Sequence, residues 1–198
     1  LDPVAKTALL ESGETLAYDS CILAHGSSAS LPPFFKPGLK GLYPLRTLSD
    51  VECILSEARP GRKAVVVGGG VLGLEAAAGL VKRGLSVNVI EFFPYLMPRQ
   101  LDKKAAALFE SKLREKSILP TLGVAVKDIA GKDRVEGLSL QDGRSFEADL
   151  IVVSTGVKPN TDWVARSGIK CNRGILVDNR MMTSAPSVYA CGDVAEWR

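Results

Sequence analysis

Histidine and paired cysteines are scarce in this sequence, and their scarcity limits the chemistry that its side chains can perform. The 198 residues include one histidine and four cysteines, and no two cysteines are spaced as C-x-x-C. The sequence therefore predicts neither a cluster of metal ligands nor a thiol–disulfide centre among these residues. We expect the cysteines to be buried thiols of a reducing compartment, namely Cys21, Cys53, Cys171 and Cys191.

A strong excess of one charge and an unbroken apolar run are also lacking. The 25 Lys and Arg residues and 22 Asp and Glu residues leave a net charge of +3, which predicts no nucleic-acid or membrane partner. An apolar stretch of about membrane-spanning length, residues 64–81, is interrupted by Glu75 and by glycines. The opening residues, LDPVAKTALL, do not read as a signal peptide. We therefore expect a globular, cytoplasmic protein, as the 46% hydrophobic and 24% charged residues also indicate.

Three glycines spaced G-x-G-x-x-G lie in VVVGGGVLGLEAAAGLVKRGLSVNVIE (65–91). RKAVVVG predicts a strand buried on both faces, LEAAAGLVKRG a helix closed by Gly84, and LSVNVIE a second strand. In such a unit Gly68 permits the tight turn, Gly70 lets a diphosphate approach the backbone, and Gly73 lets helix and strand pack closely. The N–H groups at the helix start then hold the phosphates. The stretch therefore predicts a dinucleotide site of the Rossmann type.

A carboxylate at the end of the second predicted strand bears on the choice of dinucleotide. Glu91 stands 23 residues beyond Gly68, where it can accept hydrogen bonds from the adenosine ribose. It would repel a 2′-phosphate, and Phe92 and Phe93 supply no compensating cation, which favours NADH over NADPH. Arg99 is the nearest positive residue that could weaken this preference. FAD also carries an unphosphorylated ribose, so Glu91 alone does not separate NAD from FAD.

Two stretches share one pattern at a constant offset, SGETLAYDSCILAHG (12–26) and DGRSFEADLIVVSTG (142–156). Each predicts a hairpin turn, a polar strand and a buried strand that ends in glycine. The matching positions, each 130 apart, are Gly13 and Gly143, Leu16 and Phe146, Asp19 and Asp149, and Gly26 and Gly156. Since a phosphate loop precedes only the second stretch, we expect the tail of one dinucleotide domain followed by a complete second one.

Taken together, these motifs resemble the central part of the FAD-dependent pyridine nucleotide-disulfide oxidoreductases, which are flavoprotein reductases with two dinucleotide domains. YDSCILAHGS and DLIVVSTGVKPNTDWV resemble the two ATG segments of the family, and TSAPSVYACGDVAE (183–196) resembles its terminal FAD motif. PYLMPRQLD (94–102) is most similar to the large subunit of NAD(P)H nitrite reductase and to rubredoxin-reductase-like relatives. One position departs from the pattern, because His25 stands where the first ATG segment has threonine.

The resemblance implies cofactor-binding roles for individual residues. The NAD diphosphate loop would comprise Gly68, Gly70, Val71, Leu72 and Gly73, with Glu91 on the ribose. Glu75 would lie near the nicotinamide, with an ordinary helix-face charge as the alternative. Gly156 would let the nicotinamide end approach the backbone. Arg46 would lie near the flavin, with a surface arginine as the alternative, and Asp193, after Gly192, would bind the flavin ribityl chain.

The expected fold is α/β, with a Rossmann-type parallel sheet, helices on both faces and a small antiparallel meander within residues 119–149. Partial FAD-binding segments, 1–58 and 158–198, are expected to flank an NAD(H)-binding domain at 59–157. Residues 30–45 read as a loop rich in Pro and Gly. The helical pattern of residues 101–117 predicts a face formed by Leu101, Ala105, Leu108 and Lys112.

The implied activity is hydride transfer from NADH to FAD, followed by electron transfer to a downstream acceptor protein or domain. No side-chain nucleophile, base or metal is expected to be catalytic. The alternatives are a flavoprotein NADH oxidase or disulfide reductase, and a non-catalytic NAD-binding module. This chain alone is expected to be inactive, to bind FAD weakly and to expose apolar surface at its flanking segments. Self-association is left open.

Overall fold

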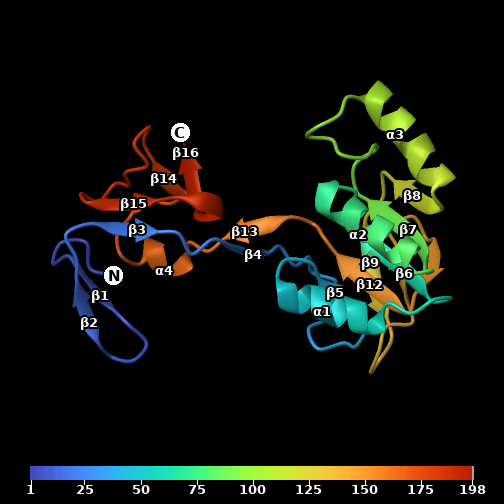
Figure 1. The fold of residues 1–198 in the computed structure, drawn as a ribbon, viewed down its shortest axis with the longest axis horizontal. Helices are drawn as coiled ribbons and strands as arrows, with labels where there is room; N and C mark the ends of the chain where they lie inside the picture. Colours follow the sequence, from blue (N-terminus) through green and yellow to red (C-terminus); the bar gives the residue numbers. More distant parts are fainter. Residues whose placement is uncertain (198) are drawn as a thin grey trace. The chain divides into compact units, whose positions relative to one another are not determined.

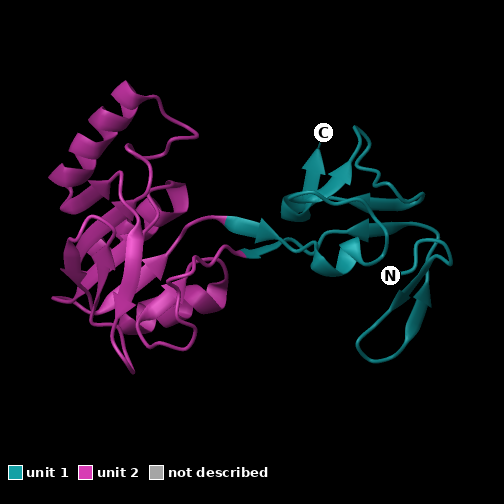
Figure 2. Cartoon of the chain, turned by 180° about the vertical axis from the view of Figure 1, so that it is seen from behind, with its two compact units in different colours: residues 1–28, 157–198 teal, residues 29–156 magenta. Residues whose placement is uncertain are grey.

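The computed structural model describes residues 1–197, whose contacts divide into two compact units. One unit comprises residues 29–156, and the other combines residues 1–28 with 157–198 (Figure 2). The second division, between residues 156 and 157, lies within one residue of the expected boundary. The first division differs, because residues 29–58 group with the Rossmann unit: β5 (Leu42–Pro44) joins its sheet and α1 (Leu48–Glu57) packs on it.

A parallel sheet of five strands forms the centre of the unit of residues 29–156. Its order is β5-β12-β6-β7-β8, and every neighbouring pair is parallel. The remaining strands span Lys63–Val67 (β6), Ser86–Glu91 (β7), Ile118–Leu122 (β8) and Leu150–Val153 (β12). The carboxyl ends of β6, β7 and β12 lie in register at Val67, Ile90 and Val153. The loops that follow these three strands are therefore neighbours.

Different layers cover the two faces of this sheet. In β6, Ala64 and Val66 belong to the core beneath α1, α2 (Val71–Lys82) and α3 (Lys103–Glu115). Val65 and Val67 belong instead to the core beneath an antiparallel meander on the other face (Figure 1). The meander strands are β9 (Val126–Ala130), β10 (Gly137–Leu140) and β11 (Ser145–Glu147). The α/β class and the meander are confirmed, but the three helices share one face rather than two.

Several local predictions are corrected by packing. Helix α3 buries Ala106 and Leu113, whereas Leu108, on the predicted face, is 66% exposed. Residues 30–45 contain strand β5, and β8 belongs to the parallel sheet rather than to the meander. The cysteines are not fully buried, since Cys53 and Cys191 are exposed and the other two are intermediate. Within residues 1–197, no helix is long and apolar enough to cross a membrane.

The other unit is built from short paired strands. The hairpin β1 (Thr7–Leu9) and β2 (Thr15–Ala17) is antiparallel. Strands β3 (Cys21–Leu23) and β15 (Val188–Ala190) are parallel, as are β14 (Ile175–Val177) and β16 (Ala195–Trp197). The remaining elements are β4 (Ser27–Ala29), its partner β13 (Val157–Pro159), α4 (Asp162–Ala165) and a 3₁₀ turn at Gly192–Val194. Ile22 and Leu9 are 67% and 69% exposed in this unit.

The internal repeat is visible in the strand boundaries. Strand β2 spans 15–17 and β11 spans 145–147, while β4 spans 27–29 and β13 spans 157–159. Both pairs keep the 130-residue offset. The glycines that close the two copies, Gly26 and Gly156, both have positive φ, at 68° and 100°. The repeat predicted from the sequence is therefore confirmed in the backbone.

A buried carboxylate links the end of α1 to the meander. Glu57 is 7% exposed. It accepts hydrogen bonds from Arg62 Nη1 at 2.7 Å and Arg134 Nη2 at 2.6 Å. The hydrogen bond from Arg134 holds the pKa of Glu57 below its usual range. Burial opposes this shift, and the hydrogen bond from Arg62 adds to it. These bonds therefore link the end of α1 to Arg62, just before β6, and to Arg134, between β9 and β10.

We expect Glu57→Gln to lower the free energy of unfolding by about 2 kcal/mol, because two guanidinium groups lose a charged acceptor. Since folding lowers the pKa of Glu57, its contribution is present above the unfolded pKa and is lost as the pH falls through the folded one. Urea unfolding at neutral and acidic pH measures both effects. Glu147→Gln, which removes an exposed partner of Lys63, is the control and should change little. Equal stability of the two variants would contradict the prediction.

Candidate dinucleotide-binding sites

The turn between β6 and α2 is so tight that two of its positions exclude a side chain. Gly68 has φ +119° and donates its N–H to Ile90 O at 2.8 Å. A Cβ on Gly68 would collide with the Ser154 carbonyl oxygen, and one on Gly73 would collide with the Gly68 carbonyl oxygen. The motif glycines thus bring β6, α2 and the loop after β12 into direct backbone contact, as the sequence predicted for Gly68 and Gly73.

Open space lies beside the N-cap residue of α2. Gly70 is the N-cap of α2, and no side chain caps it. A Cβ placed on Gly70 would meet nothing within 4 Å. Val71 and Leu72, in the first turn, are 47% and 48% exposed. Because first-turn N–H groups have no partner inside a helix, this end of α2 combines backbone donors with room for an anion.

Glu91 is both buried and engaged with the backbone. It is 7% exposed. Its Oε2 accepts the Gly69 N–H at 2.5 Å, and its Oε1 accepts the Phe93 N–H at 2.9 Å. A carboxylate has about four acceptor positions, so about two remain for two ribose hydroxyls. Phe92, directly after Glu91, is 67% exposed and offers no charge. The carboxylate therefore stands at the turn between β6 and α2, which is the predicted phosphate turn (residues 68–70).

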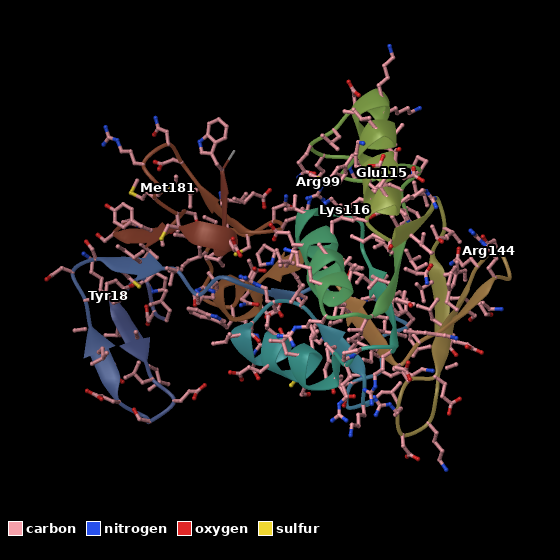
Figure 3. All side chains as sticks on the ribbon, turned by 45° about the vertical axis from the view of Figure 1, so that its right-hand side comes forward. Tyr18, Arg99, Glu115, Lys116, Arg144 and Met181 are labelled. Carbon is pink, nitrogen blue, oxygen red and sulfur yellow. The ribbon has the colours of Figure 1, made fainter. Side chains whose placement is uncertain are left out.

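The segment after β7 braces the turn from outside. Gly69 O accepts the Met97 N–H at 3.1 Å. A Cβ on Gly69 would lie 2.6 Å from Leu96 Cδ2 and 2.9 Å from Glu91 Oε2. Gly69 was missed as a functional position, although its place within an uninterrupted GGG was an available signal. Arg99, farther along this segment, is exposed (Figure 3).

Helix α2 carries two further candidate residues, Leu72 and Glu75. Glu75 is exposed on α2, which is compatible both with a place near the nicotinamide and with an ordinary helix-face charge. Leu72 lines an apolar groove of about 240 Å³ between α1 and α2, together with Ile54 and Ala76. The side chain of Leu72 is thus used in this groove, which leaves its N–H as the group available to a phosphate.

Two more candidates stand at the carboxyl edge of the same sheet. Gly156 follows β12, and its carbonyl accepts the Ser30 N–H at 2.9 Å. Arg46 follows β5 and is exposed, and its N–H donates to Asp50 Oδ2 at 3.0 Å. Because β5, β12 and β6 are consecutive parallel strands, the loops carrying Arg46, Gly156 and Gly68 share one edge. Ligands of α/β sheets bind at this edge.

The unit of residues 1–28 and 157–198 holds the remaining candidates. Because β3 and β15 are parallel, the residues after each strand lie side by side. Ser27 Oγ donates to Asp193 Oδ2 at 2.8 Å. Gly192 has φ +72° and open space around it. Ser27 was missed by sequence reasoning, since its partner is 166 residues away.

Known proteins are similar to this chain over nearly its whole length. The family model of the pyridine nucleotide-disulphide oxidoreductases matches residues 2–198. The chain is 42% identical over 198 residues to nitrite reductase [NAD(P)H] of Bacillus subtilis (strain 168), covering 100% of this chain and 25% of that protein. It is 34% identical to the ferredoxin--NAD(+) reductase subunit of the benzene 1,2-dioxygenase system of Pseudomonas putida, covering 100% and 48%.

A solved structure, the covalent putidaredoxin reductase–putidaredoxin complex, superposes with a TM-score of 0.95 at 27% identity. It covers 100% of this chain and 49% of the matched chain. The chain thus spans between a quarter and a half of the length of these relatives.

Proposed function

Since the chain belongs to the pyridine nucleotide-disulphide oxidoreductase family, we propose that it is the NADH-binding core of a flavoprotein reductase and that it holds part of the FAD site. Bound NADH would supply a hydride that FAD accepts and passes on as electrons to a downstream acceptor. The chain's own residues bind and orient the two dinucleotides, and no side-chain nucleophile or base is assigned to the reaction.

One observation carries the NADH part of the proposal. The open N-terminus of α2 and the carboxylate of Glu91 are joined through Gly69, whose N–H donates to Glu91 at 2.5 Å. In a dinucleotide the diphosphate is next to the adenosine ribose, so one ligand can meet both the helix N-terminus and the carboxylate. The proposed NAD residues are Gly68, Gly70, Val71, Leu72 and Gly73 for the diphosphate, Glu91 for the ribose, and Glu75 and Gly156 for the nicotinamide end.

The FAD part of the proposal depends on the other unit. Asp193 accepts a hydrogen bond from Ser27 and stands beside Gly192, where a Cβ would meet nothing within 4 Å. A carboxylate so placed accepts hydrogen bonds from a polyhydroxyl chain such as the flavin ribityl group. Arg46 is proposed to lie near the flavin. We keep the expected domain assignment as part of this proposal: residues 1–58 and 158–198 contribute to FAD binding, and 59–157 bind NAD(H).

The acceptor is proposed from the relatives. The matched proteins named above are a nitrite reductase and a reductase of a ferredoxin, and the solved complex holds a reductase with putidaredoxin. We infer that the whole protein passes its electrons to a protein or domain that carries a redox centre. An NADH oxidase or disulfide reductase of the same architecture is the alternative. In the absorption spectrum of the whole protein, NADH should bleach flavin bands, whereas a colourless whole protein would indicate an NAD-binding module.

We expect calorimetry on the 198-residue chain to show that NADH binds at least about tenfold more tightly than NADPH, because Glu91 repels a 2′-phosphate. FAD should bind more weakly than NADH, since only part of its site is present. The control for the ribose end of the site is a competition experiment, in which adenosine 2′-phosphate is titrated against bound NADH. Equal affinity for NADH and NADPH would contradict the proposed role of Glu91.

A further inference from the structure

The repeat places His25 at the position of Thr155, and Asn160 at the position of Ser30, each 130 residues apart. In the Rossmann unit, Thr155 Oγ1 donates to Ser30 O at 2.7 Å, and Ser30 N–H donates to Gly156 O at 2.9 Å. This pair of bonds connects Thr155 and Gly156, which close the second copy of the repeat, to Ser30, which follows the first copy.

The same pair of bonds occurs at the related position of the other unit. His25 Nε2 lies 2.7 Å from Asn160 O, and Asn160 N–H donates to Gly26 O at 3.1 Å. A carbonyl oxygen only accepts hydrogen bonds, so Nε2 must carry the proton. The imidazole therefore donates to the carbonyl that corresponds to the acceptor of the Thr155 hydroxyl.

Further contacts fix the segment that follows His25. The imidazole packs against Trp163, with ring centroids 4.7 Å apart and the rings tilted by 45°. Asn160 Nδ2 donates to His25 O at 3.2 Å, and Asn160 Oδ1 accepts from Ser28 Oγ at 2.8 Å. Ser27, between these anchored residues, donates to Asp193. The contacts of Asn160 thus determine where the Ser27 hydroxyl meets the Asp193 carboxylate.

We propose that His25 is a positioning residue that takes the place of a threonine hydroxyl, holding residues 25–28 on Asn160 so that Ser27 orients Asp193. The geometry needs a donor at position 25 that reaches the Asn160 carbonyl, and not an imidazole as such. The inference rests on the proposed function only in naming Asp193 as a flavin ligand, because its bonds are present without any cofactor.

Three variants of the 198-residue chain separate the donor from the ring: His25→Gln keeps an N–H donor of similar reach, His25→Phe keeps an aromatic ring, and His25→Ala keeps neither. Hydrogen exchange of the Asn160 amide and the ¹³C shift of the Asp193 carboxyl are measured by NMR without cofactor. We expect both to stay near the parent values in His25→Gln. In the other two variants, exchange should be about tenfold faster and the carboxyl shift should move.

Thr155→Val is the matched control, because it removes the related donor and should accelerate exchange at Ser30 while leaving Asn160 unchanged. The ¹⁵N spectrum of the unsubstituted chain should show the neutral imidazole protonated at Nε2, and this measurement needs no variant to fold. A proton on Nδ1, a His25→Phe protein that matches the parent, or a His25→Gln protein that behaves like His25→Ala would each overturn the proposal. Because no nucleotide is present, failure of FAD or NADH binding would not produce these results.

Discussion

Gly73→Ala is expected to abolish measurable NADH binding and to lower the free energy of unfolding by about 3 kcal/mol. The added Cβ would collide with the Gly68 carbonyl oxygen, which is backbone and lies in the phosphate turn. Relief requires α2 to move away from β6 or the turn at Gly68 to open. Either change displaces the first-turn N–H groups from the place where they meet a diphosphate. Urea unfolding and calorimetry with NADH measure the two effects.

Two other glycines of the same helix serve as matched controls. A Cβ on Gly79 would meet nothing within 4 Å. Gly79→Ala should therefore stabilise the protein by about 0.5–1 kcal/mol, through helix propensity, and leave NADH binding unchanged. Gly70→Ala also meets open space, so it should fold normally yet weaken NADH binding, because the methyl group enters the proposed diphosphate position. If Gly73→Ala bound NADH as well as Gly79→Ala does, the close contact would not be needed.

The phosphate turn could be predicted from sequence because its physical requirements are local. A β-branched run, a missing side chain at fixed positions and a helical pattern all lie within residues 63–82, so spacing alone identifies them. The repeat could be predicted for the same reason, since Gly26 and Gly156 each need a positive φ at the end of a strand. The sequence pattern was sufficient to predict the structure where a single residue type, here glycine, satisfies a single backbone requirement.

Other features depended on contacts between distant residues and were not predictable. Strand β5 lies in a stretch rich in Pro and Gly, and it becomes a strand only because the edge of β12 accepts it in register, Leu42 opposite Ile151. The packing face of α3 was wrong because its small buried residue, Ala106, carries a weak hydrophobic signal. The donor role of His25 depends on Asn160, 135 residues away. No local pattern encodes such a pairing.

Glu91→Gln is expected to weaken NADH binding by about tenfold to a hundredfold without improving NADPH binding. The carboxylate accepts two backbone N–H groups with two different oxygens, from Gly69 and from Phe93. An amide provides one oxygen, so its NH₂ group must face one of the two donors. A buried donor without an acceptor costs about 1–3 kcal/mol, which corresponds to that range of affinity. Removing the charge therefore damages the turn as well as the ribose site.

Calorimetry with NADH and NADPH measures the affinities, and hydrogen exchange of the Gly69 amide in the absence of nucleotide measures the turn. Glu115→Gln is the control, because this carboxylate is exposed at the end of α3 and pairs with Lys112 at 2.9 Å. A Glu91→Gln protein with unchanged exchange at Gly69, or with a gain in NADPH affinity, would show that Glu91 acts on the ribose alone. If both expectations hold, cofactor preference and the shape of the phosphate turn cannot be changed independently at position 91, and a switch to NADPH would first require another acceptor for the Gly69 N–H.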